Sequence, residues 1–320
     1  MYTLGIDLGG TNIAVGLCDE QLHMIDKGSI PTVTKDGAER VARDMAELCR
    51  KIIERNGLTV KDIASVGIAT PGIANSVKGV VEYANNLPFL NFPIADVFKQ
   101  YLPVEKVVIA NDANAAALGE ALAGSAKGAK SAVMVTLGTG VGSGIILDGK
   151  IFAGGMNYAG AEIGHTVIVA GGRQCSCGRR GCWEAYCSAT ALSRVTEEKM
   201  QELSLKGIPS LLFDEAKREG KVSARTAFNA MRRGDKYGRE LVDEYINYLA
   251  VGMGNIVNVF QPEIISIGGG VSNEKEYLTE PLTELVRLEQ YTRNNPVVTK
   301  IVTATLGNDA GIIGAAGLGR

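Results

Sequence analysis

Two tight, glycine-rich turns, one in each half of the chain, constrain its fold more than any other feature. The first joins an apolar stretch at residues 2–7 to a second at residues 13–18 through Gly9-Gly10-Thr11. The other follows residues 132–136 and runs through Leu137-Gly138-Thr139-Gly140 into a second expected strand at residues 144–147. Two strands joined this closely form a hairpin, not the strand–helix step of a dinucleotide-binding fold. The repeated pattern predicts a duplicated fold with a cleft between its halves.

Helical and strand patterns are mixed along the rest of the chain, which indicates an α/β protein. Residues 37–56 place apolar side chains on one helical face, and residues 64–70 form an apolar stretch typical of a buried strand. We expect a smaller N-terminal lobe over residues 1–112, with residues 301–320 packing back on it. A larger lobe then covers residues 113–300.

Composition excludes several classes of partner. The chain has 33 Lys and Arg against 35 Asp and Glu, a net charge of −2, so it has no basic field for nucleic acid or an anionic membrane. Asp7 interrupts the apolar stretch that a signal peptide needs. The mainly apolar residues 131–147 are too short and too rich in glycine to span a bilayer. We therefore expect a cytoplasmic protein.

The two turns suit a polyphosphate. Glycine lets backbone N–H groups approach an anion closely, and neutral hydroxyl and amide side chains add donors. No GxxxxGK[ST] motif occurs, and Ser143 stands where a dinucleotide fingerprint starting at Gly138 needs glycine. A tight hairpin with an ordinary capping Asp is the alternative for the first turn alone. The candidate nucleotide-binding residues here are Asp7, which can hold a water of Mg²⁺, and Gly9, Gly10, Thr11, Asn12, Thr139 and Gly140.

Three cysteines within eight residues indicate a metal site. Cys175, Cys177 and Cys182 lie at spacings of two and five, and His165 is ten residues upstream. One His and three Cys satisfy tetrahedral Zn²⁺, and a closed four-ligand site of this kind is structural. Cys187 could replace His165 as the fourth ligand, or the thiols could be buried without metal.

Candidate substrate-binding side chains, which can donate and accept several hydrogen bonds, lie near these motifs. They are Asn86, Asn111, Asp112, Glu162, His165 and Glu184, with Gly72 offering backbone contact. Locally, Asn111 or Asp112 could instead only cap the alanine-rich helix that follows. Gly269 and Gly270, after an apolar stretch, offer a flat backbone against which a purine can lie.

A family resemblance begins at residues 7–11 and extends along the whole chain. Two segments carry its most specific part. They are Gly160–His165, GAEIGH, and Cys175–Glu184, CSCGRRGCWE. The sequence resembles the ROK family of sugar kinases and repressors, within the actin-like ATPase superfamily, and in particular its glucokinase-like branch. The resemblance implies a ribonuclease H-like fold with a zinc knuckle, whose two lobes close on a sugar and MgATP, and a homodimer.

For the site, the resemblance implies that Asn111 and Asp112 hold the 4- and 6-hydroxyl end of the sugar. Glu162, His165 and Glu184 face the other end of the ring, and Asp112 acts as the catalytic base. We therefore expect an ATP-dependent kinase that phosphorylates glucose at the 6-hydroxyl.

Several alternatives stay open. The sugar could be an N-acetylhexosamine, fructose, mannose or allose. The phosphoryl donor could be polyphosphate instead of ATP, and the assembly could be a tetramer. A sugar-responsive repressor would carry a helix-turn-helix before the first turn, where only six residues precede Asp7.

Overall fold

The computed structural model describes residues 1–156 and 158–320, which divide into two compact units. The first unit consists of residues 1–134, 144–161 and 305–320, and the second of residues 135–143 and 162–304. The expected lobe boundaries at residues 112 and 300 stay a prediction. No helix among the described residues has the length and apolar character to span a membrane.

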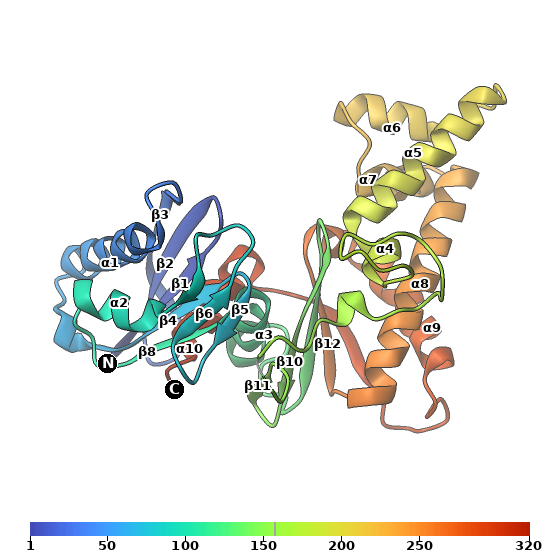
Figure 1. Ribbon diagram of the computed structural model, residues 1–320. Coiled ribbons are helices and arrows are strands. Elements are labelled where there is room, and N and C mark those ends of the chain that lie inside the picture. Colours follow the sequence, from blue (N-terminus) through green and yellow to red (C-terminus); the bar gives the residue numbers. More distant parts are fainter. Residues whose placement is uncertain (157) are drawn as a thin grey trace. The chain divides into compact units, whose positions relative to one another are not determined.

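A five-stranded sheet forms the centre of the first unit (Figure 1). Its strand order is β3-β2-β1-β4-β8, with β1 and β2 antiparallel and β1, β4 and β8 parallel. The first predicted hairpin is therefore confirmed. The strands are β1 (Tyr2–Leu8), β2 (Asn12–Cys18), β3 (Met24–Pro31), β4 (Ile63–Thr70) and β8 (Val107–Asn111).

Helices cover both faces of this sheet. Leu4 and Ile6 share a core with the apolar face of α1, where Met45 and Ile52 are fully buried. Because side chains alternate along a strand, Gly5 points to the opposite face, where it contacts α10. The helices are α1 (Ala38–Arg55), α2 (Ile94–Tyr101), α3 (Asp112–Ala123) and α10 (Ala310–Gly317), with a 3₁₀ turn η1 (Val60–Asp62).

Helix α10 packs on its neighbours backbone to backbone. A Cβ atom at Gly5 would lie 1.9 Å from the Ile312 carbonyl oxygen, and one at Gly67 1.8 Å from that of Ala315. On the other side of α10, a Cβ at Gly314 would lie 1.7 Å from the Ala115 carbonyl oxygen of α3. Only glycine permits these approaches, so three glycines bring β1, β4 and α3 against one helix.

A buried carboxylate holds the segment by which the chain re-enters the first unit. Glu120 is 1% exposed and accepts hydrogen bonds from the backbone N–H groups of Thr305 (3.0 Å), Leu306 (2.8 Å) and Ser125 (2.7 Å). These donors replace the water that the carboxylate loses on burial. They fasten residues 305–306 to the last turn of α3.

A small three-stranded sheet, β5 (Ile73–Asn75), β6 (Val80–Tyr83) and β7 (Leu90–Phe92), also belongs to the first unit. The sequence analysis did not anticipate it.

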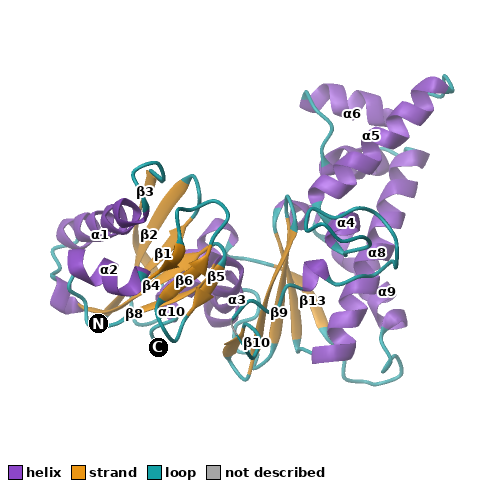
Figure 2. Ribbon diagram, viewed as in Figure 1, coloured by secondary structure: helices purple, strands orange, loops and turns teal. Residues whose placement is uncertain are grey.

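A second five-stranded sheet has the order β11-β10-β9-β12-β13, so the strands of the second predicted hairpin, β9 and β10, are neighbours. Strand β10 begins at Val141, three residues before the expected start. The chain thus combines two five-stranded sheets with many helices, which confirms the α/β class (Figure 2). The strands are β9 (Ala132–Leu137), β10 (Val141–Leu147), β11 (Lys150–Phe152), β12 (Ile264–Gly268) and β13 (Lys300–Thr303).

The helices of the second unit lie mainly between residues 184 and 289. They are α4 (Glu184–Cys187), α5 (Ala189–Leu205), α6 (Leu211–Glu219), α7 (Ala224–Arg232), α8 (Lys236–Phe260) and α9 (Glu276–Glu289), with 3₁₀ turns η2 (Ile163–His165) and η3 (Gly270–Glu274). The chain ends in the first unit with the 3₁₀ turn η4 (Gly307–Asp309) and the helix α10.

Candidate active site

The carboxyl ends of three parallel strands bring candidate residues together in the first unit. Asp7 pairs with Ala69 near the end of β1, and Asn111 pairs with Thr70 at the end of β8. Gly72 lies two residues after the end of β4, and its carbonyl oxygen accepts a hydrogen bond from Asn111 Nδ2 at 3.2 Å. In α/β sheets, ligands bind outside this end of the strands.

Asn111, not Asp112, is the N-cap of α3. Its Oδ1 accepts hydrogen bonds from the N–H groups of Ala113 (2.9 Å) and Asn114 (3.3 Å). Asp112 is the first helical residue, and its Oδ1 accepts only from the Ala113 N–H at 2.9 Å. The sequence offered Asn111 and Asp112 as candidates for the N-cap of α3, and the structure assigns this role to Asn111. Asp112 Oδ2 makes no hydrogen bond within the described part of the chain and is available for chemistry.

The first glycine turn is held closed from β3. The Gly9 N–H donates to the Asn12 carbonyl at 2.8 Å, and the Thr32 hydroxyl donates to the Gly9 carbonyl at 2.7 Å. Thr11 and Asn12 stay exposed. A Cβ at Gly10 would lie 3.1 Å from the Asn86 Cβ, so the predicted phosphate turn lies beside a predicted sugar ligand.

Asp7 and Asp112 form an electrostatically coupled acidic pair. Burial, and then the charge of Asp112, raise the pKa of Asp7 to about 6, and the charge of Lys27 offsets this only in part. Two neighbouring half-buried carboxylates, one at the end of β1 and one at the start of α3, favour binding of a hard cation such as Mg²⁺. These residues therefore fit the predicted magnesium.

The second glycine turn is fixed by contacts within the second unit. The Gly138 N–H donates to the Gly140 carbonyl at 3.0 Å, and the Gly138 carbonyl accepts from the Ala189 N–H at 2.8 Å. Gly269, at φ +81°, lies so close to the backbone of Leu137 that a Cβ there would be 2.5 Å from the Leu137 carbonyl oxygen. Thr139 is exposed, and Gly270 begins η3. The predicted adenosine glycines therefore adjoin the predicted phosphate turn.

The segment that carries Glu162 and His165 packs on the beginning of β10. The Ile163 N–H donates to Ser143 Oγ at 3.2 Å, and a Cβ at Gly164 would lie 2.1 Å from the Val141 carbonyl oxygen. Glu162 is exposed and His165 half-buried, so both can reach a ligand.

His165, Cys175, Cys177 and Cys182 converge in one cluster. Their donor atoms all lie within 4.8 Å of one another, with His165 Nδ1 3.6 Å from Cys175 Sγ. Burial, together with the neighbouring thiols, raises the pKa of Cys182 to about 12, so this thiol holds a proton that a metal ion would displace. Cys187 is fully buried and does not belong to this group. The set of one His and three Cys fits tetrahedral zinc, and His165, not Cys187, lies with the other three residues.

Glu184 has structural partners that the sequence did not reveal. One of its oxygens, Oε2, accepts from the Val141 N–H at 3.1 Å, and the other accepts from Ser176 Oγ at 2.7 Å. A Cβ at Gly140 would lie 2.4 Å from Oε2. Thr32, Ser143 and Ser176, which hold the predicted site residues, give no signal in the sequence because their partners are set by tertiary contacts.

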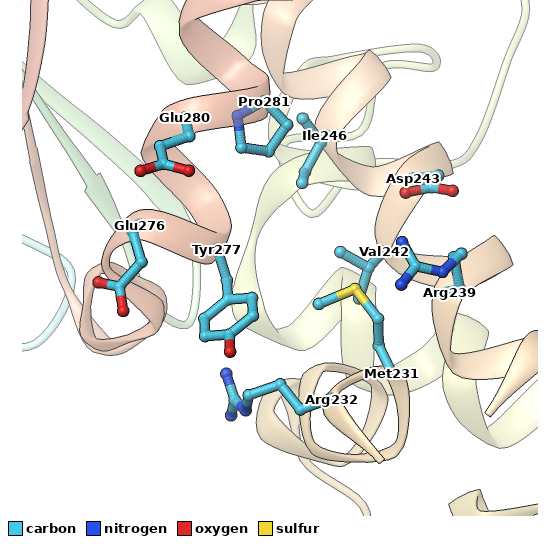
Figure 3. A pocket seen from close by; sticks show the side chains of 10 residues that line it. All are labelled: Met231, Arg232, Arg239, Val242, Asp243, Ile246, Glu276, Tyr277, Glu280 and Pro281. Atoms are coloured by element: carbon cyan, nitrogen blue, oxygen red, sulfur yellow. The ribbon is translucent and has the colours of Figure 1, made fainter. Parts of the chain in front are cut away.

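A cavity of about 510 Å³ lies among α7, α8 and α9 of the second unit (Figure 3). Tyr277 and Arg232 form one side of it, with the guanidinium 5.1 Å from the ring centroid. Arg232 also pairs with the buried Glu274, at the end of η3. None of the residues predicted from the sequence lines this cavity.

Comparison with known proteins agrees with the sequence resemblance. The family model described as ROK family matches residues 3–320. A glucokinase of Halalkalibacterium halodurans is 36% identical over 322 residues, covering 98% of this chain and 93% of that protein. The crystal structure of a ROK hexokinase from Thermus thermophilus has a TM-score of 0.79 and 32% identity, covering 99% and 97% of the two chains.

A second crystal structure, of a ROK family glucokinase from Streptomyces griseus in complex with glucose and AMPPNP, is 31% identical. It has a TM-score of 0.76 and covers 99% of both chains. The fold is therefore the α/β sugar-kinase fold of the actin-like ATPase type.

The pair Asp7–Asp112 generates a prediction about pH. Since the pKa of Asp7 rises from 3.8 in the unfolded chain to about 6, the folded protein binds more protons between these values. Stability therefore falls as the pH rises through this window, and the full cost is present above it. We expect Asp7→Asn to raise the melting temperature at about pH 7.5, with a gain that shrinks at about pH 4.5.

Thermal melts without nucleotide or Mg²⁺ measure this difference. Asp96→Asn is the matched control, because Asp96 is an exposed carboxyl in the first turn of α2. An Asp7→Asn gain of equal size at both pH values would contradict the assignment.

Proposed function

Because the chain belongs to the ROK family, we propose that it is an ATP-dependent hexose kinase that phosphorylates glucose at its 6-hydroxyl. One observation carries the chemical part of this proposal. Asn111 takes the capping role at α3, which leaves the Asp112 carboxylate with an oxygen available at the edge where three parallel strands end. A carboxylate so placed can act as a base toward a bound hydroxyl.

We assign seven residues to the sugar. Gly72, Asn86, Asn111 and Asp112 come from the first unit, and Glu162, His165 and Glu184 come from the second. The carboxylates and the imidazole accept hydrogen bonds from hydroxyls, and the amides donate as well as accept. His165 turns Nδ1 toward Cys175, so its Nε2 is the nitrogen that we assign to the sugar.

We assign the nucleotide to the two glycine turns and the end of β12. Their members are Asp7, Gly9, Gly10, Thr11, Asn12, Thr139, Gly140, Gly269 and Gly270. The backbone N–H groups of Gly10 and Gly140 bind phosphate oxygens, and the hydroxyls of Thr11 and Thr139 add donors. Gly9 closes the first turn through its own N–H, and Gly269 and Gly270 lie against the purine. Asp7 would hold Mg²⁺ through water, and the ion, when bound, neutralises charge on the phosphates.

The transfer then needs little covalent help from the protein. Asp112 accepts the proton of the 6-hydroxyl while that oxygen bonds to the γ-phosphorus of ATP. The bond from phosphorus to the β,γ-bridging oxygen breaks, and ADP leaves with that electron pair. The turns hold the reactants in line, which contributes more to the rate than the base does.

An assay of ADP release tests both the activity and the base. We expect the highest kcat/KM for glucose among glucose, N-acetylglucosamine, N-acetylmannosamine, mannose, fructose and allose. Asp112→Asn keeps the side-chain shape but cannot accept a proton, so kcat should fall by roughly 10²–10⁴. Its glucose Kd should change less, because the amide still bonds the hydroxyl.

Asp96→Asn, at the first turn of α2, is the control for the loss of charge at a helix start. Retention of more than about a tenth of wild-type kcat by a folded Asp112→Asn protein would remove Asp112 from the role of base. A preference for an N-acetylhexosamine would leave the mechanism intact and correct the substrate.

We also propose one structural zinc per chain at His165, Cys175, Cys177 and Cys182. Zinc would fix the loop that carries His165, since four ligands from one segment of about 20 residues close it on the ion. Elemental analysis should find one zinc per chain in the wild type and far less in Cys177→Ala. Cys187→Ala is the matched control and should keep its zinc. An equal loss of zinc from both variants would contradict this ligand set.

Finally, we propose that the protein forms a homodimer. Two hydrogen bonds, from the Tyr291 N–H to Asn258 Oδ1 and from the Thr299 hydroxyl to the Pro262 carbonyl, connect residues 291–299 to the end of α8 and the residues after it. Exposed apolar side chains in and beside these segments supply a contact surface. These side chains are Val259, Leu288, Tyr291, Val297 and Val298. Light scattering should give twice the chain mass of 33.8 kDa, and Tyr291→Asp should lower it toward one chain. An unchanged mass in that variant would exclude this surface.

A further inference from the structure

Ser176 lies between two of the proposed zinc ligands but points to a different partner. Its hydroxyl donates to Glu184 Oε1 at 2.7 Å, while Glu184 Oε2 accepts from the Val141 N–H at 3.1 Å. A single carboxylate thus connects the Cys/His loop to the residue that follows the second glycine turn. All of these residues belong to the second unit.

The carboxylate is held by hydrogen bonds alone. At Oε1 the short one comes from Ser176, and the Cys175 thiol lies farther away, with its Sγ at 3.7 Å from the same oxygen. Glu184 has no ion pair with a described Lys, Arg or His within 4.0 Å, so no cation fixes its orientation. It is also pressed closely against the turn, since a Cβ at Gly140 would lie 2.4 Å from Oε2. Glycine at position 140 is therefore required for this contact, in addition to any approach of phosphate.

We propose that Ser176 is a positioning residue for nucleotide binding: it orients the Glu184 carboxylate, which in turn holds the peptide between Gly140 and Val141. This peptide ends the turn that the Gly138 N–H closes on the Gly140 carbonyl. If the carboxylate rotates, the peptide loses its partner and the N–H groups of the turn no longer keep one direction. The Cys/His loop thereby sets the geometry of a phosphate-binding turn, in addition to carrying a sugar ligand.

The proposal rests on the proposed kinase function, and binding measurements separate the two. Calorimetry with AMPPNP on the wild-type protein comes first: no binding there would overturn both. Ser176→Ala removes only the hydroxyl from an exposed position, so the variant should fold. We expect its AMPPNP Kd to rise roughly three- to tenfold, the size of one lost hydrogen bond. Its zinc content should stay at the wild-type level.

Ser176→Thr keeps the hydroxyl and is the rescue control, with an AMPPNP Kd within about twofold of the wild type. An unchanged AMPPNP Kd in Ser176→Ala would overturn the proposal, whether or not the glucose Kd changes. Loss of zinc from Ser176→Ala would also overturn it, because Ser176 would then act through the metal site and not through Glu184.

Discussion

Direct contact between backbones holds the first unit together. Helix α10 lies so close to β1, β4 and α3 that no side chain fits at Gly5, Gly67 or Gly314. The same helix passes Asp7, whose carboxylate would lie 3.1 Å from a Cβ at Gly311. Since α3 begins at Asp112, one helix fixes both members of the acidic pair. Such packing leaves no side chain free to rearrange, so contacts between backbones fix the positions of Asp7 and Asp112.

The second unit positions its candidate residues differently. Glu162, His165 and Glu184 come from loops, a single 3₁₀ turn and the start of a four-residue helix. Such short elements are not rigid by themselves, so their order depends on hydrogen bonds to β10 and on the cysteine cluster. A structural metal is an effective way to order a loop of this kind, because four strong bonds replace the apolar core that the loop lacks.

The sequence predicted those elements whose signals are local. The two hairpins, the buried face of α1 and the convergence of three cysteines with His165 all follow from spacing. The sheet β5-β6-β7 was missed because strands of three or four residues are too short to show a period of two. Strand β10 was expected to start late because its glycines at 142 and 144 conceal the strand pattern.

The remaining features depend on tertiary contacts. Only the structure shows that Asn111 caps α3, and that Glu184 binds Val141 and Ser176. These partners lie up to 43 residues apart in the chain, and no local pattern relates them. The roles assigned to individual site residues stay predictions that the binding and kinetic experiments address.

The anchoring of residues 305–306 by Glu120 has a consequence for biosynthesis. Residues 1–134 leave the ribosome first, yet the face of β1 and β4 that packs on α10 stays uncovered until residues 310–317 are made. At about 5–20 residues per second, this interval lasts roughly 10–40 seconds. A nascent chain with an open apolar sheet for that long is a natural client for a chaperone. Premature termination within the second unit would leave the first unit permanently unfinished, and so exposed to proteases.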